Sequence, residues 1–214
     1  GLICVLCLVD MWQIDKRYLN DGMFVEKSVR ENPIQMTATD KQILQDKTEC
    51  GNYRVLNFAS NTFSENETSY FHKSLGGYHP AKLRRYQEMI ERYIQPQMQK
   101  AMTAIVEAGG DMTKVNGDSI YPVISMLNAK YFVMPLNGGQ TVPIMNPYAY
   151  GVAWFVDKVS FVDNANQEMD LMAKIDLRHE AVADKKFARQ IGNATKQDGN
   201  SLVTITSYQP NELT

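Results

Sequence analysis

The sequence predicts an α+β fold: a mixed β-sheet of about five strands packed with helices. Three observations lead to this prediction. Segments with helical periodicity alternate with runs of β-branched and aromatic residues, but without a strict βαβ order. Hydrophobic residues make up 44% of the chain, which is enough for a substantial core. The length of 214 residues fits one large domain or two small ones.

Five segments have the composition of strands. Residues 153–162 form the longest and most aromatic run, and residues 201–208 alternate between β-branched and polar side chains. The predicted strands are residues 53–58, 130–134, 140–145, 153–162 and 201–208, and residues 181–183 are a candidate for one more. The turn signals Asn146-Pro147 and Pro210-Asn211 follow two of these strands.

The longest predicted helix begins near Pro80. A proline suits the first position of a helix, where its missing N–H has no intrahelical partner to lose. Leu83, Tyr86 and Ile90 then recur at three- and four-residue steps and predict a buried stripe. Pro96 is expected to end or kink this helix, and a second segment is expected over residues 97–108. Shorter helices are predicted over residues 39–47, 118–127 and 164–175.

The amino terminus is a short apolar run. Residues 2–9 are apolar and Asp10 follows, so the run is far shorter than the roughly 20 residues that span a bilayer. It has no basic region or cleavage site of a signal peptide. Two interpretations remain open from the pattern: a buried strand, or the last two turns of a membrane helix that begins upstream. We expect residues 1–16 to lie outside a domain formed by residues 17–214.

Charge and cysteine content exclude two classes of function. The formal net charge of −2 gives no overall basic field, so a nucleic acid is not an expected partner. Cys4 and Cys7 form a C-x-x-C pair inside an apolar run, and a zinc site would need two more ligands at compatible spacing. We therefore predict no metal and no cofactor. The twelve Met and eleven Tyr residues either fill the core or line a site for a sugar or lipid.

A candidate ligand-binding segment covers residues 69–87. Its Gly-Gly turn precedes the predicted helix, and the basic residues Lys82 and Arg85 would oppose the helix macrodipole. A bound anion would offset that repulsion, with Lys82 and Arg85 as its contacts, glycine amides assisting and aromatic side chains flanking it. The candidate site residues are Tyr70, His72, Gly76, Gly77, Tyr78, His79, Lys82 and Arg85. The alternative is a solvated basic helix face beside an ordinary turn.

Catalysis by this chain has weak support in the sequence. Ser69, His72 and Ser74 lie close together, but no G-x-S-x-G nucleophile elbow is present. The carboxylates Asp111, Asp118, Glu65 and Glu67 have a spacing that defines no acid–base pair by itself. No catalytic residue is assigned.

Several motifs together resemble the extracytoplasmic part of the YfhO family of bacterial membrane proteins, in a Bacteroidetes-type version. The motifs run in the family's order and cover nearly the whole chain, although no single one is specific. They are Asp10-Met-Trp, Lys16-Arg-Tyr-Leu-Asn, Arg54-Val-Leu-Asn, Asn61-Thr-Phe, Thr68-Ser-Tyr, Gly76-Gly-Tyr-His, Ala81-Lys-Leu-Arg-Arg-Tyr-Gln, Met126-Leu-Asn-Ala-Lys-Tyr, Asn146-Pro-Tyr and Ala153-Trp-Phe-Val.

The resemblance implies a membrane protein of the GT-C glycosyltransferase type, thought to move a sugar from a polyprenyl-phosphate carrier to an acceptor in the cell envelope. This chain would be a membrane-anchored extracytoplasmic segment on the periplasmic side of the inner membrane. Residues 2–9 would then be the end of a transmembrane helix. The implied partners are the protein's own transmembrane helices, a C-terminal β-rich module, and a polyprenyl-phosphate sugar or envelope glycan. The role implied here is recognition of carrier or acceptor; the alternative is a structural domain that packs on the other parts.

Overall fold

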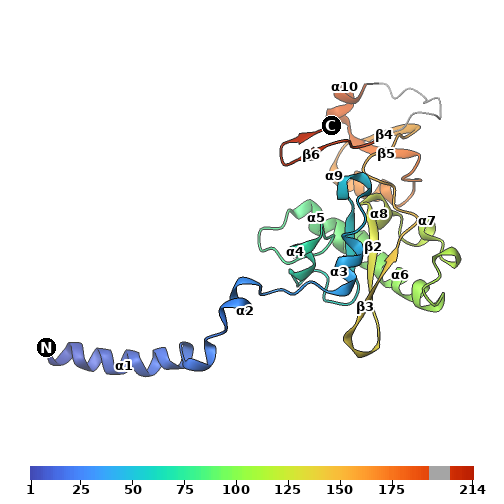
Figure 1. The fold of residues 1–214 in the computed structure, drawn as a ribbon. Helices are drawn as coiled ribbons and strands as arrows, with labels where there is room; N and C mark the ends of the chain where they lie inside the picture. Colours follow the sequence, from blue (N-terminus) through green and yellow to red (C-terminus); the bar gives the residue numbers. More distant parts are fainter. Residues whose placement is uncertain (193–202) are drawn as a thin grey trace. The chain divides into compact units, whose positions relative to one another are not determined.

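The structure is a computed structural model and describes residues 1–192 and 203–214 (Figure 1). The chain falls into two units, Gly1–Gln35 and Met36–Thr214. The division between the units therefore falls after residue 35 and differs from the predicted boundary after residue 16.

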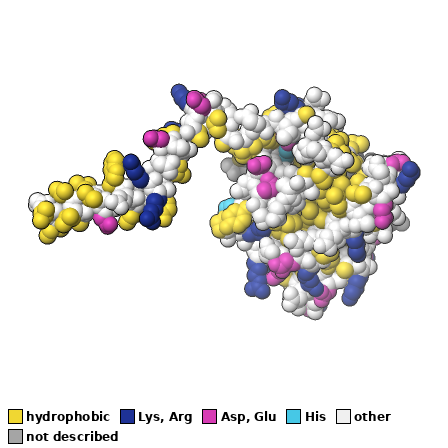
Figure 2. Space-filling model, turned by 90° about the horizontal axis from the view of Figure 1, so that it is seen from below, with side chains coloured by type: hydrophobic (Ala, Val, Ile, Leu, Met, Phe, Trp, Pro, Cys, Tyr) yellow, Lys and Arg dark blue, Asp and Glu magenta, His cyan; other side chains and the backbone are white. Residues whose placement is uncertain are grey.

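The amino-terminal unit is helical. Helix α1 spans Leu2–Tyr18, so the apolar run 2–9 forms a helix and the alternative of a buried strand is wrong. A short 3-10 turn, Asp21–Met23, and helix α2, Lys27–Glu31, follow. Every side chain of α1 is exposed, and Figure 2 shows hydrophobic side chains along this helix. Within the described residues, no helix is both long enough and apolar enough to span a bilayer.

The second unit has a three-stranded main sheet in the order β1-β2-β3. Strand β1, Arg54–Asn57, runs parallel to β2, Ala129–Pro135, and β2 runs antiparallel to β3, Thr141–Met145. The fold is α+β as predicted, but the expected sheet of about five strands is wrong. Strand β4, Lys158–Val162, and strand β5, Glu180–Asp184, form a separate parallel pair.

The separate pair is a small βαβ unit. Helix α9, Ala165–Met172, connects β4 to β5 and packs against both strands, so the pair is complete without the main sheet. The predicted strand 201–208 is also mostly absent. Residues 201 and 202 lie outside the described residues, and only Tyr208–Gln209, β6, pairs with Glu212–Leu213, β7, across the predicted turn.

The main sheet buries both of its faces. On one face Leu56, Phe132 and Met134 belong to a large core that also holds Ile94 and Ile105. On the other face a smaller core contains Ile43, Tyr53, Val55 and Val133. Successive strand residues point to opposite faces, so strands buried on both sides need apolar residues at nearly every position. The buried middle of each strand meets this requirement, with Val55 and Leu56 in β1 and Phe132, Val133 and Met134 in β2.

One long helical stretch covers the first of these faces. It consists of α5, Arg84–Met89, a π-helical turn, Ile90–Ile94, and α6, Gln95–Glu107. The helix begins at Arg84 and the predicted start at Pro80 is wrong. The ring nitrogen Nδ1 of His79 accepts the N–H of Ala81 at 3.0 Å, and such a local side-chain bond favours a turn over a helix.

The remaining helices are short. They are α3, Ala38–Ile43; α4, Glu67–Phe71; α7, Gly117–Ile120; α8, Pro122–Met126; and α10, Ala188–Ile191. Helix α3 has a capping box, in which Thr37 and Asp40 each accept the other's backbone N–H. The helix predicted over 118–127 is two helices, because Tyr121 between them has non-helical angles.

Removal of the Phe132 ring tests the large core. Phe132 is fully buried and packs edge-on against Tyr121 and Phe58, with ring centroids 5.5 Å apart in both pairs. We expect Phe132→Ala to lower the free energy of unfolding by about 3–5 kcal/mol in urea titrations. The control is Leu136→Ala, whose side chain is 50% exposed and whose loss is expected to cost about 0.5 kcal/mol or less. Equal effects of the two substitutions would contradict the assigned core.

Candidate functional site: an apolar pocket beside a polar pocket

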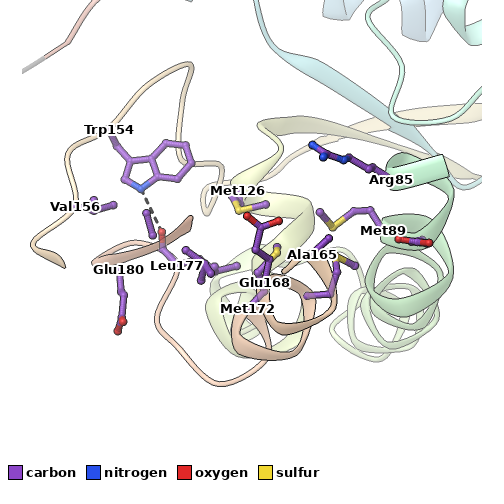
Figure 3. A pocket seen from close by; sticks show the side chains of 14 residues that line it. Arg85, Met89, Met126, Trp154, Val156, Ala165, Glu168, Met172, Leu177 and Glu180 are labelled. Carbon is purple, nitrogen blue, oxygen red and sulfur yellow. Dashed lines mark hydrogen bonds between the residues drawn. The ribbon is translucent and has the colours of Figure 1, made fainter. Parts of the chain in front are cut away.

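A methionine-rich cavity of about 410 Å³ is here called the apolar pocket. It lies where α5 and α8 face α9 and β5 (Figure 3). Its volume lies within the range of about 300–1,000 Å³ that small-molecule sites occupy. Its apolar lining consists of Met89, Met126, Trp154, Val156, Ala165, Met169, Met172, Leu177, Ala181 and Val182.

Four charged residues also line the apolar pocket: Arg85, Glu88, Glu168 and Glu180. Glu88 pairs with Arg84 at 3.0 Å and Glu180 pairs with Lys158 at 2.8 Å. Within the described part of the chain, the side chains of Arg85 and Glu168 form no hydrogen bond or ion pair. Arg85 does have an acidic neighbour, because hydrogen bonds from Lys186 and then the charge of Arg85 lower the pKa of Asp184. Glu168 and, less completely, Arg85 therefore remain for contact with a ligand.

Trp154 forms one wall of the apolar pocket. Its indole N–H donates to the carbonyl oxygen of Leu177 at 3.2 Å, the bond that Figure 3 draws as a dashed line. Its ring also packs edge-on against Tyr150, with the centroids 5.1 Å apart. A tryptophan held by one hydrogen bond and one ring contact presents a fixed apolar face to the cavity.

A smaller polar pocket of about 180 Å³ adjoins the apolar pocket, because Met126 and Trp154 line both. Its other lining residues are Asn52, Arg54, Lys73, Asn128, Gly151, Val152 and Tyr208. Two of these are cations and none is a carboxylate. The two cavities together offer an apolar body and a polar, positively charged end.

Of the predicted site residues, only Arg85 lines the apolar pocket, and none lines the polar pocket. Tyr70 and His72 line a third cavity of about 310 Å³, here called the Asp46 pocket after its acidic residue. Tyr78 and His79 are exposed, and Lys82 has its Nζ 5.6 Å from the centre of the Phe63 ring. The structure therefore distributes the predicted residues among several places.

The Gly76–Gly77 turn serves packing within its own loop. The N–H of Gly76 donates to Ser74 Oγ at 2.9 Å, and that of Gly77 donates to the carbonyl of Thr62 at 2.7 Å. A Cβ on Gly76 would lie 2.0 Å from that same carbonyl oxygen, so only glycine fits. The expectation that these two amides assist in anion binding is wrong, because both are already bonded.

His72 is held by an acidic partner. Its side chain is 2% exposed, and Nε2 lies 2.9 Å from Oδ1 of Asp40. Burial alone would raise the pKa of Asp40, but hydrogen bonds from Thr37 and His72 outweigh burial and lower it. His72 thus links α4 to the cap of α3.

The sequence analysis missed the methionines, Trp154 and Leu177 of the apolar pocket. The only signal was the high methionine count, for which a lipid or sugar site was one of two interpretations. In the described part of the chain, no group of three or more His, Cys, Asp and Glu side chains is arranged to hold a metal ion.

Comparison of the chain with protein-family models, curated proteins and solved structures gave no match. The resemblance to the YfhO family therefore stays a prediction, and the site is interpreted from its own geometry.

The Asp46 carboxylate should make the free energy of unfolding depend on pH. It pairs with Lys130 at 2.8 Å and accepts from the Tyr131 hydroxyl at 2.9 Å. Burial alone would raise the pKa of Asp46, but hydrogen bonds from Lys130, Thr48 and Tyr131 lower it well below its ordinary 3.8. Burial, with that same carboxylate, raises the pKa of Tyr131 to about 12.

A carboxyl whose pKa is lower in the folded state stabilises the fold above its unfolded pKa, and the stabilisation is lost as the pH falls. We therefore expect Asp46→Asn to reduce the free energy of unfolding by roughly 2–4 kcal/mol at pH 7. The gap should narrow below about pH 4, where the unfolded wild-type carboxyl is protonated. Urea titrations from pH 3 to pH 7 measure this, and a gap that is constant with pH would contradict the assigned network.

Proposed function

We propose that this chain is a non-catalytic recognition domain that binds an amphipathic ligand with an anionic end. In the wider protein its role is accessory to glycosyl transfer, through recognition of a polyprenyl-phosphate carrier or of an envelope acceptor. The chemistry itself belongs to other parts of that protein. The proposal combines the family resemblance with the pockets described above.

The apolar pocket is the observation that carries this proposal. Its ten apolar lining residues come from several separate elements, and four of them are methionines, whose flexible side chains adapt to irregular apolar ligands. Arg85 lies at this cavity without an ion-pair partner among the described residues. A phosphate-bearing isoprenoid would place its chain against the methionines and its charge near a cation.

Helix α1 supports attachment of the domain to a membrane. Its large apolar side chains, including Leu2, Leu6, Val9 and Trp12, are 48–77% exposed. Soluble proteins rarely leave a contiguous apolar surface of this kind uncovered. We propose that a lipid bilayer or the protein's own transmembrane helices cover it, with the domain on the extracytoplasmic side. The same observation supports the alternative, a structural domain that only packs on those helices and on a C-terminal module.

Filling the apolar pocket separates the two roles. Ala165 is the exposed first residue of α9 and lines the cavity, so Ala165→Phe should occupy the cavity without disturbing the core. The background is Trp12→Phe, which leaves Trp154 as the only tryptophan of the chain. We expect farnesyl phosphate to change Trp154 emission in a saturable way, and Ala165→Phe to weaken this binding about tenfold or more.

Ala173→Phe is the matched control for this experiment. Ala173 is the exposed C-terminal cap of the same helix and does not line the pocket, so its substitution should leave the affinity unchanged. No saturable emission change with farnesyl phosphate, or equal affinities for the two variants, would reject the proposed ligand site and favour the structural role.

Charge reversal at Arg85 tests the anionic end of the ligand. We expect Arg85→Glu to weaken binding of farnesyl phosphate about fivefold, because a nearby attraction becomes a repulsion. Binding of farnesol, which has no charge, should change little. The control is Lys100→Glu, at an exposed residue of α6 that does not line the cavity. Equal effects of the two reversals on farnesyl phosphate would show a general field effect and contradict a role for Arg85.

A further inference from the structure

We infer that the polar pocket is a separate subsite for the head of the ligand, and that it selects an anion that also carries a hydrogen-bond donor. The inference rests on the proposed function, because the body of the same ligand would occupy the apolar pocket. It assigns new roles to Lys73, Arg54 and Asn128. None of these residues belongs to the predicted set.

Charge is the first observation. Arg54 and Lys73 line the polar pocket, and no carboxylate is among its lining residues. Arg54 donates from Nη1 to the carbonyl of Leu127 at 2.7 Å. Lys73 donates to Asn52 Oδ1 and has its Nζ 3.7 Å from the centre of the Tyr208 ring. Both cations are thus positioned by neutral groups and keep their full charge for an anion.

A buried acceptor without a partner is the second observation. Asn128 lines the polar pocket and is 4% exposed. Its Nδ2 donates to Glu49 Oε2 at 3.0 Å, but its Oδ1 has no hydrogen-bond partner among the described residues. The opposite orientation of the amide would turn Oδ1 toward the Glu49 carboxylate, so the amide nitrogen belongs on that side. The oxygen has almost no accessible surface, so a ligand donor would satisfy it after a small movement of the cavity wall.

The backbone fixes this amide in place. Asn128 joins α8 to β2 in the left-handed region, with φ of 56°, which asparagine tolerates better than most residues. Its N–H donates to the carbonyl of Ser125 at 3.0 Å, and its own carbonyl accepts from the N–H of Arg54 at 2.8 Å. The acceptor therefore stands at a determined position before any ligand arrives, which reduces the entropic cost of recognition.

The shared wall of the two pockets indicates what shape of ligand fits them. Met126 and Trp154 line both cavities, so one molecule can reach from the apolar lining to the cationic end. The head must accept hydrogen bonds from Lys73 and Arg54 and donate one to Asn128. Two sources provide this chemistry: a phosphate monoester that carries a P–OH group, or an acidic sugar that carries a hydroxyl beside its carboxylate.

Alkyl probes with the same ten-carbon tail test the inference at pH 5. Decyl phosphate is then mainly a monoanion with one P–OH group, because its second pKa is about 6. Decyl sulfate is a monoanion without a donor, and decyl glucuronide is an anion with sugar hydroxyls. We expect the protein, in the Trp12→Phe background, to bind at least one donor-bearing probe about tenfold tighter than decyl sulfate. The preferred probe identifies the source of the head.

Two variants locate the effect. Lys73→Met should weaken all three anions about fivefold and leave decanol unaffected, whereas the control Lys100→Met, at an exposed position on α6, should change nothing. Asn128→Gly keeps the left-handed backbone and should abolish the preference for a donor, whereas the Glu49 carboxylate that it frees should weaken all three anions alike. Circular dichroism checks whether Asn128→Gly folds. If it does not fold, the probe series on the Trp12→Phe protein and on Lys73→Met decides whether the polar pocket selects a donor-bearing anion.

The outcomes separate this inference from the proposed function. Equal binding of decyl sulfate and both donor-bearing probes would overturn the head subsite but leave the apolar pocket as a ligand site. An unchanged affinity of Lys73→Met would do the same. Failure of decanol and every anion to bind would overturn the proposed function together with the inference.

Discussion

The second unit depends on the two-sided burial of strand β2. Phe132 and Met134 enter the large core, while Val133 enters the smaller core on the opposite face. A one-residue shift in the pairing of this strand would exchange the two sets, placing each side chain in a cavity shaped for another. The parallel pairing with β1 and the antiparallel pairing with β3 fix the strand from both edges. The residues directly connected to β2 are therefore held in fixed positions as well.

Both pockets are attached at the start of that strand. Helix α8 packs on β2 and ends at Met126, and Asn128 makes the left-handed connection directly before the strand. The wall residue of both cavities and the buried acceptor therefore follow from the register of β2. Cavities whose walls are attached to a strand that is fixed on both edges keep their geometry. A selective site generally requires such a fixed geometry.

The π-helical turn positions the other side of the apolar pocket. Pro96 has no N–H to donate to the preceding turn, and the wider hydrogen-bond spacing of Ile90–Ile94 lies directly before it. An added residue rotates the preceding turns by roughly 100° about the helix axis relative to a regular helix. Ile90 and Ile94 remain in the core with Ile105, and the segment before them presents Arg85 and Met89 to the cavity.

The sequence predicted where helices and strands lie better than it predicted which strands pair. Local patterns located β2 and β3 to within one residue at both ends of each strand, because alternation and turn signals are local properties. Strand pairing is not local, so nothing in the pattern of residues 153–162 showed that only its second half would pair, with β5. The start of α5 was missed although its cause is local: the N–H of Ala81 donates to His79 Nδ1, and this bond favours a turn where the proline signal favoured a helix. The pocket brings together Met89, Met126 and Met172, which no spacing rule connects.

The distribution of charge suits the two cavities to different parts of a ligand. Three carboxylates and one cation line the apolar pocket, so the attraction of Arg85 for an anion is partly offset there. The polar pocket reverses that balance with two cations and no lining carboxylate. An amphipathic anion therefore has a preferred direction, with its tail among the methionines and its head past Trp154. The same asymmetry disfavours a cationic head in the polar pocket, where it would face Arg54 and Lys73.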